Sequence, residues 1–415
     1  MRKPVRWIAG FIASCLSVAL ALPVGAADKT TITLALWSES AGWRDAWIGM
    51  VDSFEAQNPD ISVEILEVPN NQFIDRLLAM IATGTAPDVV RMTQRFFAGL
   101  ADQDVFLDLG PYMERTSELA DIPQLLIDMW NVDGKYLGVP FDYNPNLVSY
   151  NLDRYDEAGL PYPERNWTWD DLVDNGKKLT RRNSAGEVTQ YGFRSPWNLL
   201  PLETWARAGG SYIVSDDRKQ SGLTTRKTME AIQFLQDLSY QHEIMPPVGV
   251  PLPGISLNAG TLAMQHDGHW NVPVLLETEG LRWAMADYPH RAGEERRTVF
   301  GGGSFSVTKA TKHPDAAWKL ALFVSSDEAQ RAIVQNGISM PVRRSMMEYA
   351  VTSTAQYDQR IFVEALEYAV PNPVFPNYLE AQRILNQGLA PVRTGQRGAL
   401  EYIPSIAQAF AEAIY

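Results

Sequence analysis

Aromatic and polar side chains stand at the ends of two strand-like runs near the start of the chain, and together they could contact a small molecule. These residues are Trp37, Ser38 and Glu39 after the run 31–37, and Gln94 and Arg95 after the run 87–92. An indole can stack on the apolar face of a ring, while neighbouring polar groups hydrogen-bond to hydroxyls around its rim. We therefore expect that these side chains could contact a small molecule at the ends of the strands. Core packing by Trp37 and a plain surface position for the polar pair fit the same residues.

A second group, His266, Asp267 and His269, could hold a metal ion only if all three side chains faced one side. Residues 266 and 269 point to opposite faces of an extended strand. The chain has only 5 histidines, and no further cluster completes a coordination shell. We expect no metal and no other cofactor.

The sequence carries no catalytic motif in a suitable context. Glycoside hydrolysis needs two carboxylates facing each other across a sugar, and 49 acidic residues provide chance pairs without specifying one. A Gly-x-Ser-x-Gly elbow, a phosphate-binding P-loop and a dinucleotide fingerprint are all missing. We expect that the protein is not an enzyme. An exported glycoside-active enzyme and an adhesin-like carbohydrate module remain as weaker alternatives.

Length and composition indicate a globular chain of two domains. The 415 residues exceed one ordinary hydrophobic core. Hydrophobic residues make up 46% and charged residues 20%, as in globular proteins. The formal net charge of −13 argues against nucleic acid or an anionic membrane as the main partner.

The first 27 residues have the layout of an export signal. Arg2, Lys3 and Arg6 precede an apolar stretch, residues 7–24, and small residues follow at positions 25–27. No later segment has the ~18 uninterrupted apolar residues that a spanning helix needs. We expect export to the periplasm, and a retained membrane anchor is the weaker alternative.

The only cysteine, Cys15, lies within this leader. Residues 12–15 could pass for a lipoprotein cleavage site, but the apolar core before them is short and the sequence after them stays apolar. We expect no lipid anchor at Cys15. The rest of the chain has no cysteine, which excludes disulfides, thiol catalysis and cysteine–zinc sites there.

Hydrophobic periodicity predicts alternating strands and helices after the leader. The expected order is a strand at 31–37, a helix carrying Trp43, Trp47 and Phe54, a strand at 61–65, a helix at 73–81 and a strand at 87–92. This β-α-β-α-β order implies parallel strands with helices on the sheet faces. Ligands of such sheets bind outside the carboxyl ends of the strands. Further along, 166–182 and 224–241 are expected to be helices and 262–265 a buried strand.

Six stretches in the same order resemble extracellular solute-binding protein family 1 of bacterial ABC importers, the maltose-binding type. They are 73–90, 133–141, 147–159, 259–270 (AGTLAM followed by GHW), 301–306 (GGGSFS) and 314–318 (PDAAW). The resemblance runs from about Thr31 to the C-terminus. No single motif is decisive, and the ordered set carries the assignment.

The resemblance implies an α/β fold, a two-lobed periplasmic binding protein clamshell (type II-like), each lobe a mixed, mostly parallel sheet flanked by helices. Lobe one would comprise 28–142 plus 303–350, and lobe two 143–302 plus 351–415. Hinge crossings would lie near 143–146, 301–303 and 344–351. Asn, Pro and Gly at the first two crossings permit turns, and hinge closure around a ligand is the expected motion.

The resemblance also implies further ligand-binding residues. They are Asp142, Tyr143 and Asn144 at the hinge, Trp197, Asp267, Trp270, the backbone of Gly302 and Gly303, Arg343 and Tyr378. Turn chemistry, core packing and hinge geometry are the alternative explanations. Trp270 matches the Gly-x-Trp that recurs after the Ala-Met strand in the family, so we expect it above all to contact ligand.

A member of this family would bind a mono- or oligosaccharide and deliver it to ABC permease subunits in the membrane, and we expect a monomer that binds no nucleic acid. The alternative ligand is a phosphorylated or anionic polyol such as a glycerol phosphodiester, which Arg95, Arg343 and Arg344 could serve. The sequence does not specify the sugar, its chain length or its linkage.

Overall fold

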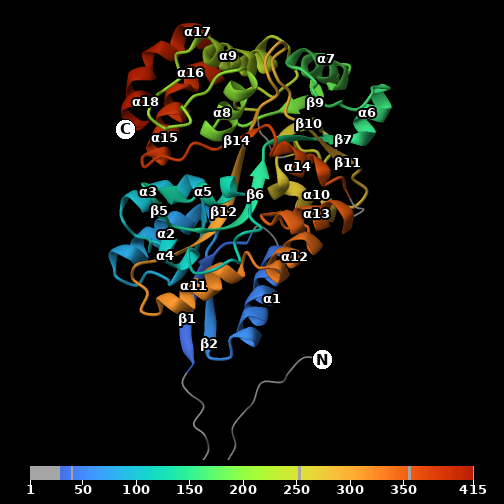
Figure 1. The fold of residues 1–415 in the computed structure, drawn as a ribbon. Coiled ribbons are helices and arrows are strands. Elements are labelled where there is room, and N and C mark those ends of the chain that lie inside the picture. The colour runs from blue at the N-terminus through green and yellow to red at the C-terminus, as the bar shows by residue number, and fades with distance from the viewer. Residues whose placement is uncertain (1–28, 39–40, 251–253, 354–356, 415) are drawn as a thin grey trace, which may run out of the picture.

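Two separate sheets organise the chain into two lobes in the computed structural model, which describes residues 29–38, 41–250, 254–353 and 357–414 (Figure 1). The expected leader, Cys15 and Glu39 lie outside the described residues. Among the described residues, none of the helices has the length and apolar character that crossing a bilayer requires.

The lobe-one sheet has the strand order β13–β6–β12–β3–β1–β2, with β14 beside β12. Its strands are β1 (Thr30–Leu36), β2 (Ile61–Glu67), β3 (Val89–Thr93), β6 (Val139–Pro145), β12 (Thr298–Val307), β13 (Met340–Pro341) and β14 (Ala369–Pro371). β1 is parallel to both β2 and β3, which confirms the β-α-β-α-β prediction. β12 is antiparallel to β3 and β6.

The helices of lobe one bury the faces that the periodicity predicts. In α1 (Ala41–Gln57), Trp47 lies 4.9 Å from Phe141 and 5.6 Å from Phe305 between ring centroids, so the helix packs directly on the sheet. The other helices of this part are α2 (Asn70–Ala82), α3 (Gln94–Asp102), α4 (Gly110–Met113), α5 (Gln124–Asp128), α11 (Pro314–Phe323), α12 (Asp327–Gln335), α13 (Arg344–Ser353) and α14 (Arg360–Ala365). A small hairpin, β4 (Asn131–Val132) and β5 (Lys135–Tyr136), precedes β6.

The lobe-two sheet has the order β11–β7–β10–β9–β8. Its strands are β7 (Leu147–Asn151), β8 (Arg181–Arg182), β9 (Val188–Arg194), β10 (Leu262–Asp267) and β11 (Trp283–Ala286). β9 and β10 are parallel, and β7 runs antiparallel to β10. The buried strand expected at 262–265 is therefore confirmed as part of β10.

Lobe two is covered by helices that begin at side-chain caps or pack on the sheet. The Thr168 side chain and Asp171 form a reciprocal capping box at the start of α7 (Trp169–Leu179), which stabilises that end. The remaining elements are α6 (Leu152–Ala158), α8 (Leu199–Ala208), α9 (Arg226–Tyr240), η1 (His269–Asn271), α10 (Val272–Glu277), α15 (Tyr378–Gly388), α16 (Ala390–Arg393), α17 (Ala399–Tyr402), η2 (Ile403–Ser405) and α18 (Ala407–Ile414).

The two lobes are joined through the strand pair β6 and β12. A single residue, Asn146, separates β6 from β7, so one extended segment passes from the first sheet into the second (Figure 1). The buried side chains form two hydrophobic cores, and the first core includes Phe362 and continues to Val374, whereas Phe375 begins the last part of the second. This packing favours a last crossing near 374–375 rather than at 344–351. The lobe limits given above remain a prediction.

Candidate functional site

Strand register brings the carboxyl ends of both sheets to the hinge. Thr93, the last residue of β3, pairs with Gly303, which pairs with Asp142 on β6. Asp267, the last residue of β10, pairs with Leu147. From residue 142 to residue 147 an extended strand spans at most about 17 Å. The strand ends of lobe one and lobe two therefore lie close together on either side of the same short connection.

Two tryptophans lie at the lobe-two edge. Trp270, on η1 just after β10, is 39% exposed, and Trp197, in the loop between β9 and α8, is half-buried. Because β9 and β10 are parallel neighbours, their carboxyl ends share one edge of the sheet. A Cβ at Gly268 would collide with the indole of Trp270, so the ring lies directly over this glycine. Trp270 thus presents an aromatic surface at the edge that faces lobe one.

Asp267, which the resemblance implies as a ligand-binding residue, is buried and hydrogen-bonded within the protein. Its carboxylate is 2% exposed. It accepts hydrogen bonds from the Ser149 hydroxyl at 2.6 Å, the Gln265 amide at 2.7 Å, the Asn271 amide at 2.8 Å and the Gly268 N–H at 2.9 Å. These donors come from β7, from β10 and from the turn that carries Trp270. Asp267 therefore holds that turn against β7, the strand that follows the hinge segment.

The same network reaches the segment that carries Trp197. Gln265 accepts a hydrogen bond from the guanidinium of Arg194 at 3.1 Å, and Arg194 is the last residue of β9. Burial lowers the pKa of Arg194, and the nearby Asp267 carboxylate opposes that shift. One polar network thus underlies both tryptophan segments. Sequence reasoning missed Arg194, Gln265 and Asn271, because nothing local indicates that their side chains meet.

The lobe-one edge is different. Trp37 is 1% exposed, its ring meets Phe73 edge-on at 4.8 Å, and the guanidinium of Arg91 lies 4.1 Å from its centroid. Arg91 also donates a hydrogen bond to the Trp37 carbonyl at 2.8 Å. The core alternative therefore holds for Trp37, which offers no exposed stacking surface. Ser38 beside it is half-buried.

Of the two predicted residues that follow β3, Gln94 is buried and Arg95 is exposed. Gln94 is buried, and its Oε1 has no hydrogen-bond partner among the described residues. That atom would lie 3.2 Å from a Cβ at Gly301, so it points at the hinge strand β12. Arg95 is exposed and donates to Asn70 at 2.7 Å. Gln94 is therefore the polar group of lobe one that is best placed to meet a ligand at the hinge.

The hinge residues mainly hold the two long strands together. Asp142 is buried and accepts from the Gly303 N–H at 2.5 Å and the Ser339 hydroxyl at 2.9 Å; Asn144 accepts from the same hydroxyl at 3.3 Å. A Cβ at Gly302 would lie 2.5 Å from the Asp142 carbonyl, so close strand contact requires glycine there. The geometry assigns Asp142, Gly302 and Gly303 to strand packing.

Tyr143, Arg343 and Tyr378 are likewise buried. The Tyr143 hydroxyl has no partner among the described residues, and burial raises its pKa. Arg343 donates to the carbonyls of Ser325 and, at 2.7 Å, Glu118, which places it in the packing of lobe one. Burial also raises the pKa of Tyr378 to about 12. Of these three, only Tyr143 has a polar atom still open to a partner at the hinge.

None of the predicted residues lines any of three cavities, of about 200, 280 and 560 Å³, that lie among the described residues. The largest lies between the lobes, and its lining includes Ala98 of α3, Asp133 of the β4–β5 turn, Arg218 and Pro376. Sequence reasoning missed this cavity. The pair Asp133-Gly134 predicts a hairpin turn, but the sequence does not show which part of lobe two lies opposite that turn. The two histidines considered above as possible metal ligands are hydrogen-bonded to tyrosine hydroxyls, His266 to Tyr288 at 2.9 Å and His269 to Tyr357 at 2.6 Å.

Comparisons with known proteins place this geometry in a family. A family model described as bacterial extracellular solute-binding protein matches residues 38–331. A protein of Brucella abortus named as a binding protein is 24% identical over 99% of this chain and 98% of its own length. An arabinooligosaccharide-binding protein of Halalkalibacterium halodurans is 27% identical over 68% of this chain and 65% of its own.

A solved structure has the same fold. It is an ABC substrate-binding protein from Listeria monocytogenes in complex with cycloalternan, with a TM-score of 0.84 and 24% identity, covering 93% of this chain and 99% of that one. The two-lobed α/β fold that the resemblance implied is therefore confirmed. The chain belongs to the bacterial extracellular solute-binding protein family.

Proposed function

We propose that this protein is the extracytoplasmic solute-binding component of an ABC importer, which captures a mono- or oligosaccharide between its lobes and delivers it to permease subunits in the membrane. The observation that carries the proposal is Trp270, an indole 39% exposed in the turn that follows the carboxyl end of β10. Aromatic faces bind the apolar faces of sugar rings. Relatives and neighbours named for oligosaccharide or cycloalternan binding support the same ligand class.

The polar partners of the sugar would come mainly from the strand ends opposite Trp270. The Oε1 atom of Gln94 and the hydroxyl of Tyr143 have no protein partner among the described residues, and both are buried near the hinge. Hydroxyl groups of a sugar can donate to both oxygens, which would satisfy groups that are costly to leave unpaired. Ligand contact with both lobes would favour closure, because such a ligand has higher affinity for the closed state.

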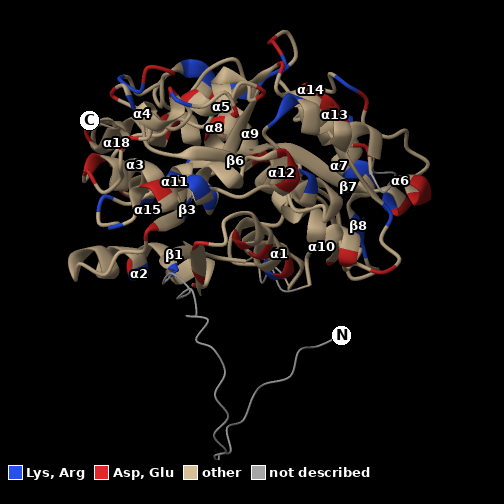
Figure 2. Cartoon of the chain, turned by 60° about the horizontal axis from the view of Figure 1, so that its bottom comes forward, with Lys and Arg blue, Asp and Glu red and all other residues tan. Residues whose placement is uncertain are grey.

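The anionic alternative has less support. Arg343 is engaged with backbone carbonyls, Arg95 with Asn70, and Arg344 with the backbone of residues 120–121. These hydrogen bonds of the three arginines therefore go to other parts of the chain and not to the turn that carries Trp270. Lys and Arg are interspersed with Asp and Glu along the chain drawn in Figure 2, and the net charge is −13. We propose a periplasmic monomer with no nucleic-acid partner and no enzymatic activity.

A thermal-shift panel tests the ligand class. Neutral mono- and oligosaccharides, sn-glycerol 3-phosphate and glycerol phosphodiesters are each compared with buffer. A ligand at ~100 times its dissociation constant adds about 2.7 kcal/mol to the free energy of unfolding. We expect at least one neutral sugar to raise the midpoint. A rise with glycerol phosphates and none with sugars would reverse the assignment, and hydrolysis of the added oligosaccharide would favour the enzyme alternative.

Small-angle scattering tests the capture step. With the sugar that gives the largest thermal shift, we expect the radius of gyration to fall at saturation, because both lobes approach the ligand. An unchanged radius under saturating sugar would count against closure while leaving sugar binding in place.

A further inference from the structure

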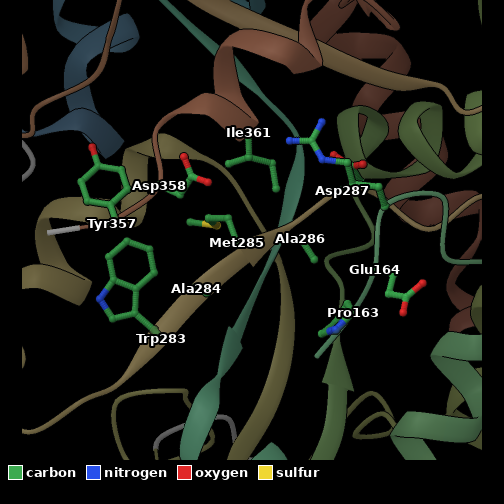
Figure 3. Close-up of a pocket in the computed structure, with 11 residues that line it drawn as sticks. Pro163, Glu164, Trp283, Ala284, Met285, Ala286, Asp287, Tyr357, Asp358 and Ile361 are labelled. Carbon is green, nitrogen blue, oxygen red and sulfur yellow. The ribbon is translucent and has the colours of Figure 1, made fainter. Parts of the chain in front are cut away.

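A cavity of about 200 Å³ lies beside the edge strand β11 at the junction of the lobes (Figure 3). Residues 163–165 form one side and Tyr357, Asp358 and Ile361 another. In the strand order of lobe two, β11 lies on one side of β7, whereas β10 and β9 lie on the other. In the sheet order, the strand that lines this cavity therefore lies on the other side of β7 from the strands that precede Trp270 and Trp197.

One end of the cavity is aromatic and apolar. The rings of Trp283 and Tyr357 lie 5.3 Å apart at an interplanar angle of 33°, and both residues are half-buried. Figure 3 shows these two side chains together at one end, with Met285 beside them. The Tyr357 hydroxyl is hydrogen-bonded to His269 Nε2 at 2.6 Å. The tyrosine ring is therefore held in place, and it forms with Trp283 a fixed aromatic surface.

The rest of the lining carries one guanidinium, that of Arg165, which forms an ion pair with Glu364, and carboxylates whose charge is largely compensated. Asp287 accepts from Arg296 at 2.5 Å and from the Tyr368 hydroxyl at 2.7 Å. Asp358 is exposed and accepts two bonds from the Arg360 guanidinium at 2.9 Å. Glu164 is exposed at the end away from the aromatic pair (Figure 3). These groups accept hydrogen bonds from hydroxyls, but they give no net positive site for an anion.

We propose that this cavity is a second binding site, separate from the one at Trp270, for a single neutral ring of the sugar or cyclitol class. The ring would stack on Trp283 and Tyr357, and its hydroxyls would donate to Asp358, which lies beside Tyr357 (Figure 3). A cavity of about 200 Å³ is large enough for one such ring. This site does not depend on what binds at Trp270.

Saturation-transfer NMR on the exported form of the chain tests the site with four probes: D-glucose, D-galactose, L-arabinose and myo-inositol. The background is the Trp270→Ala variant, so that binding at the hinge is weakened. We expect at least one probe to give a saturable signal with a dissociation constant of about 1 mM, typical of a small ligand with one stacked face. Adding Trp283→Ala should lower that affinity at least tenfold, and Trp283→Phe, which keeps an aromatic face, should retain most of it.

The matched control is Ile48→Ala, an exposed apolar residue on α1 of lobe one, which should leave the signal unchanged. Circular dichroism of each variant confirms that the chain is folded. The proposal is overturned if no probe binds the Trp270→Ala protein, or if binding survives Trp283→Ala undiminished. Binding that depends on Trp270 and not on Trp283 would also overturn it, while leaving the proposed importer function intact.

Discussion

At the edge of the lobe-two sheet Trp270 is 39% exposed, whereas at the corresponding edge of lobe one Trp37 is 1% exposed. Both residues follow a strand of a parallel pair. Their surroundings differ because Phe73 and Arg91 cover Trp37, while a glycine lies beneath Trp270. The position of an aromatic residue after a strand therefore does not decide its role. The side chains that cover the ring decide whether it is buried or exposed.

The polar groups beneath the two edges differ in the same way. Lobe two has a carboxylate, Asp267, with four donors around it and two buried neutral histidines nearby. Lobe one has a guanidinium, Arg91, within 4.1 to 5.2 Å of the ring centroids of Trp37, Trp43 and Trp47. The hydrogen bonds of Asp267 fix the turn but leave the side chain of Trp270 partly exposed. The guanidinium of Arg91 lies against three tryptophan rings that are buried in the core of lobe one.

The largest expected effect is on stability, from Trp37→Ala. Truncating a buried tryptophan removes its packing and leaves a cavity beneath Arg91, so we expect the free energy of unfolding to fall by about 3–5 kcal/mol. Urea titration of the variant measures it. Trp270→Ala is the matched control and should change stability by less than about 1 kcal/mol. Equal losses in the two variants would mean that the edges do not differ as described.

The second effect is a pH dependence of the free energy of unfolding that comes from two buried histidines of lobe two. Burial lowers the pKa of His266 and of His269 to about 3, against about 6.5 in an unfolded chain. Below pH ~6.5 the unfolded chain binds more protons than the folded one, so the stability contribution of each histidine falls with falling pH. At about pH 5 the loss is about 2 kcal/mol for each histidine.

The variant His266→Gln isolates this contribution. Urea titrations of both proteins at about pH 7.5 and about pH 5 should give a stability difference about 2 kcal/mol smaller in the variant, because one of the two buried titrating groups is gone. An identical pH dependence in the two proteins would show that the pKa of His266 is the same in the folded and the unfolded chain.

Sequence periodicity was sufficient for the parallel strands of lobe one and for the capped helix at Thr168, because those signals are local. It could not separate Trp37 from Trp270, since Phe73 and Arg91 lie 36 and 54 positions away from Trp37 along the chain. The burial of Asp267 could not be predicted for the same reason. Its carboxylate accepts a hydrogen bond from Ser149, which is 118 positions away, as well as from near neighbours. Long-range partners decide exposure, and no short motif records them.

The third prediction concerns binding. Trp270→Ala should weaken the affinity for the sugar found in the thermal-shift panel by about 2 kcal/mol, roughly thirtyfold, because one stacking surface is lost at a central position. Isothermal titration measures this loss. Trp197→Ala should have a smaller effect, since Trp197 is half-buried against the second core. A full loss with Trp197→Ala and none with Trp270→Ala would exchange their roles.

The smallest expected effect is also the most specific, because Gly268→Ala changes the position of Trp270 without removing it. Residue 268 has φ −161° and ψ −174°, an extended conformation that alanine adopts without strain. The added Cβ would collide with the indole, so the ring must move off its position while Asp267 still holds the turn. We expect sugar affinity to fall by about 1 kcal/mol, roughly fivefold. In the Trp270→Ala background the same change should have no effect, because there is no ring to displace, and the double-mutant cycle measures that coupling. Additive losses from the two substitutions would mean that Gly268 acts on the ligand directly, through its own backbone, and not through the position of the tryptophan.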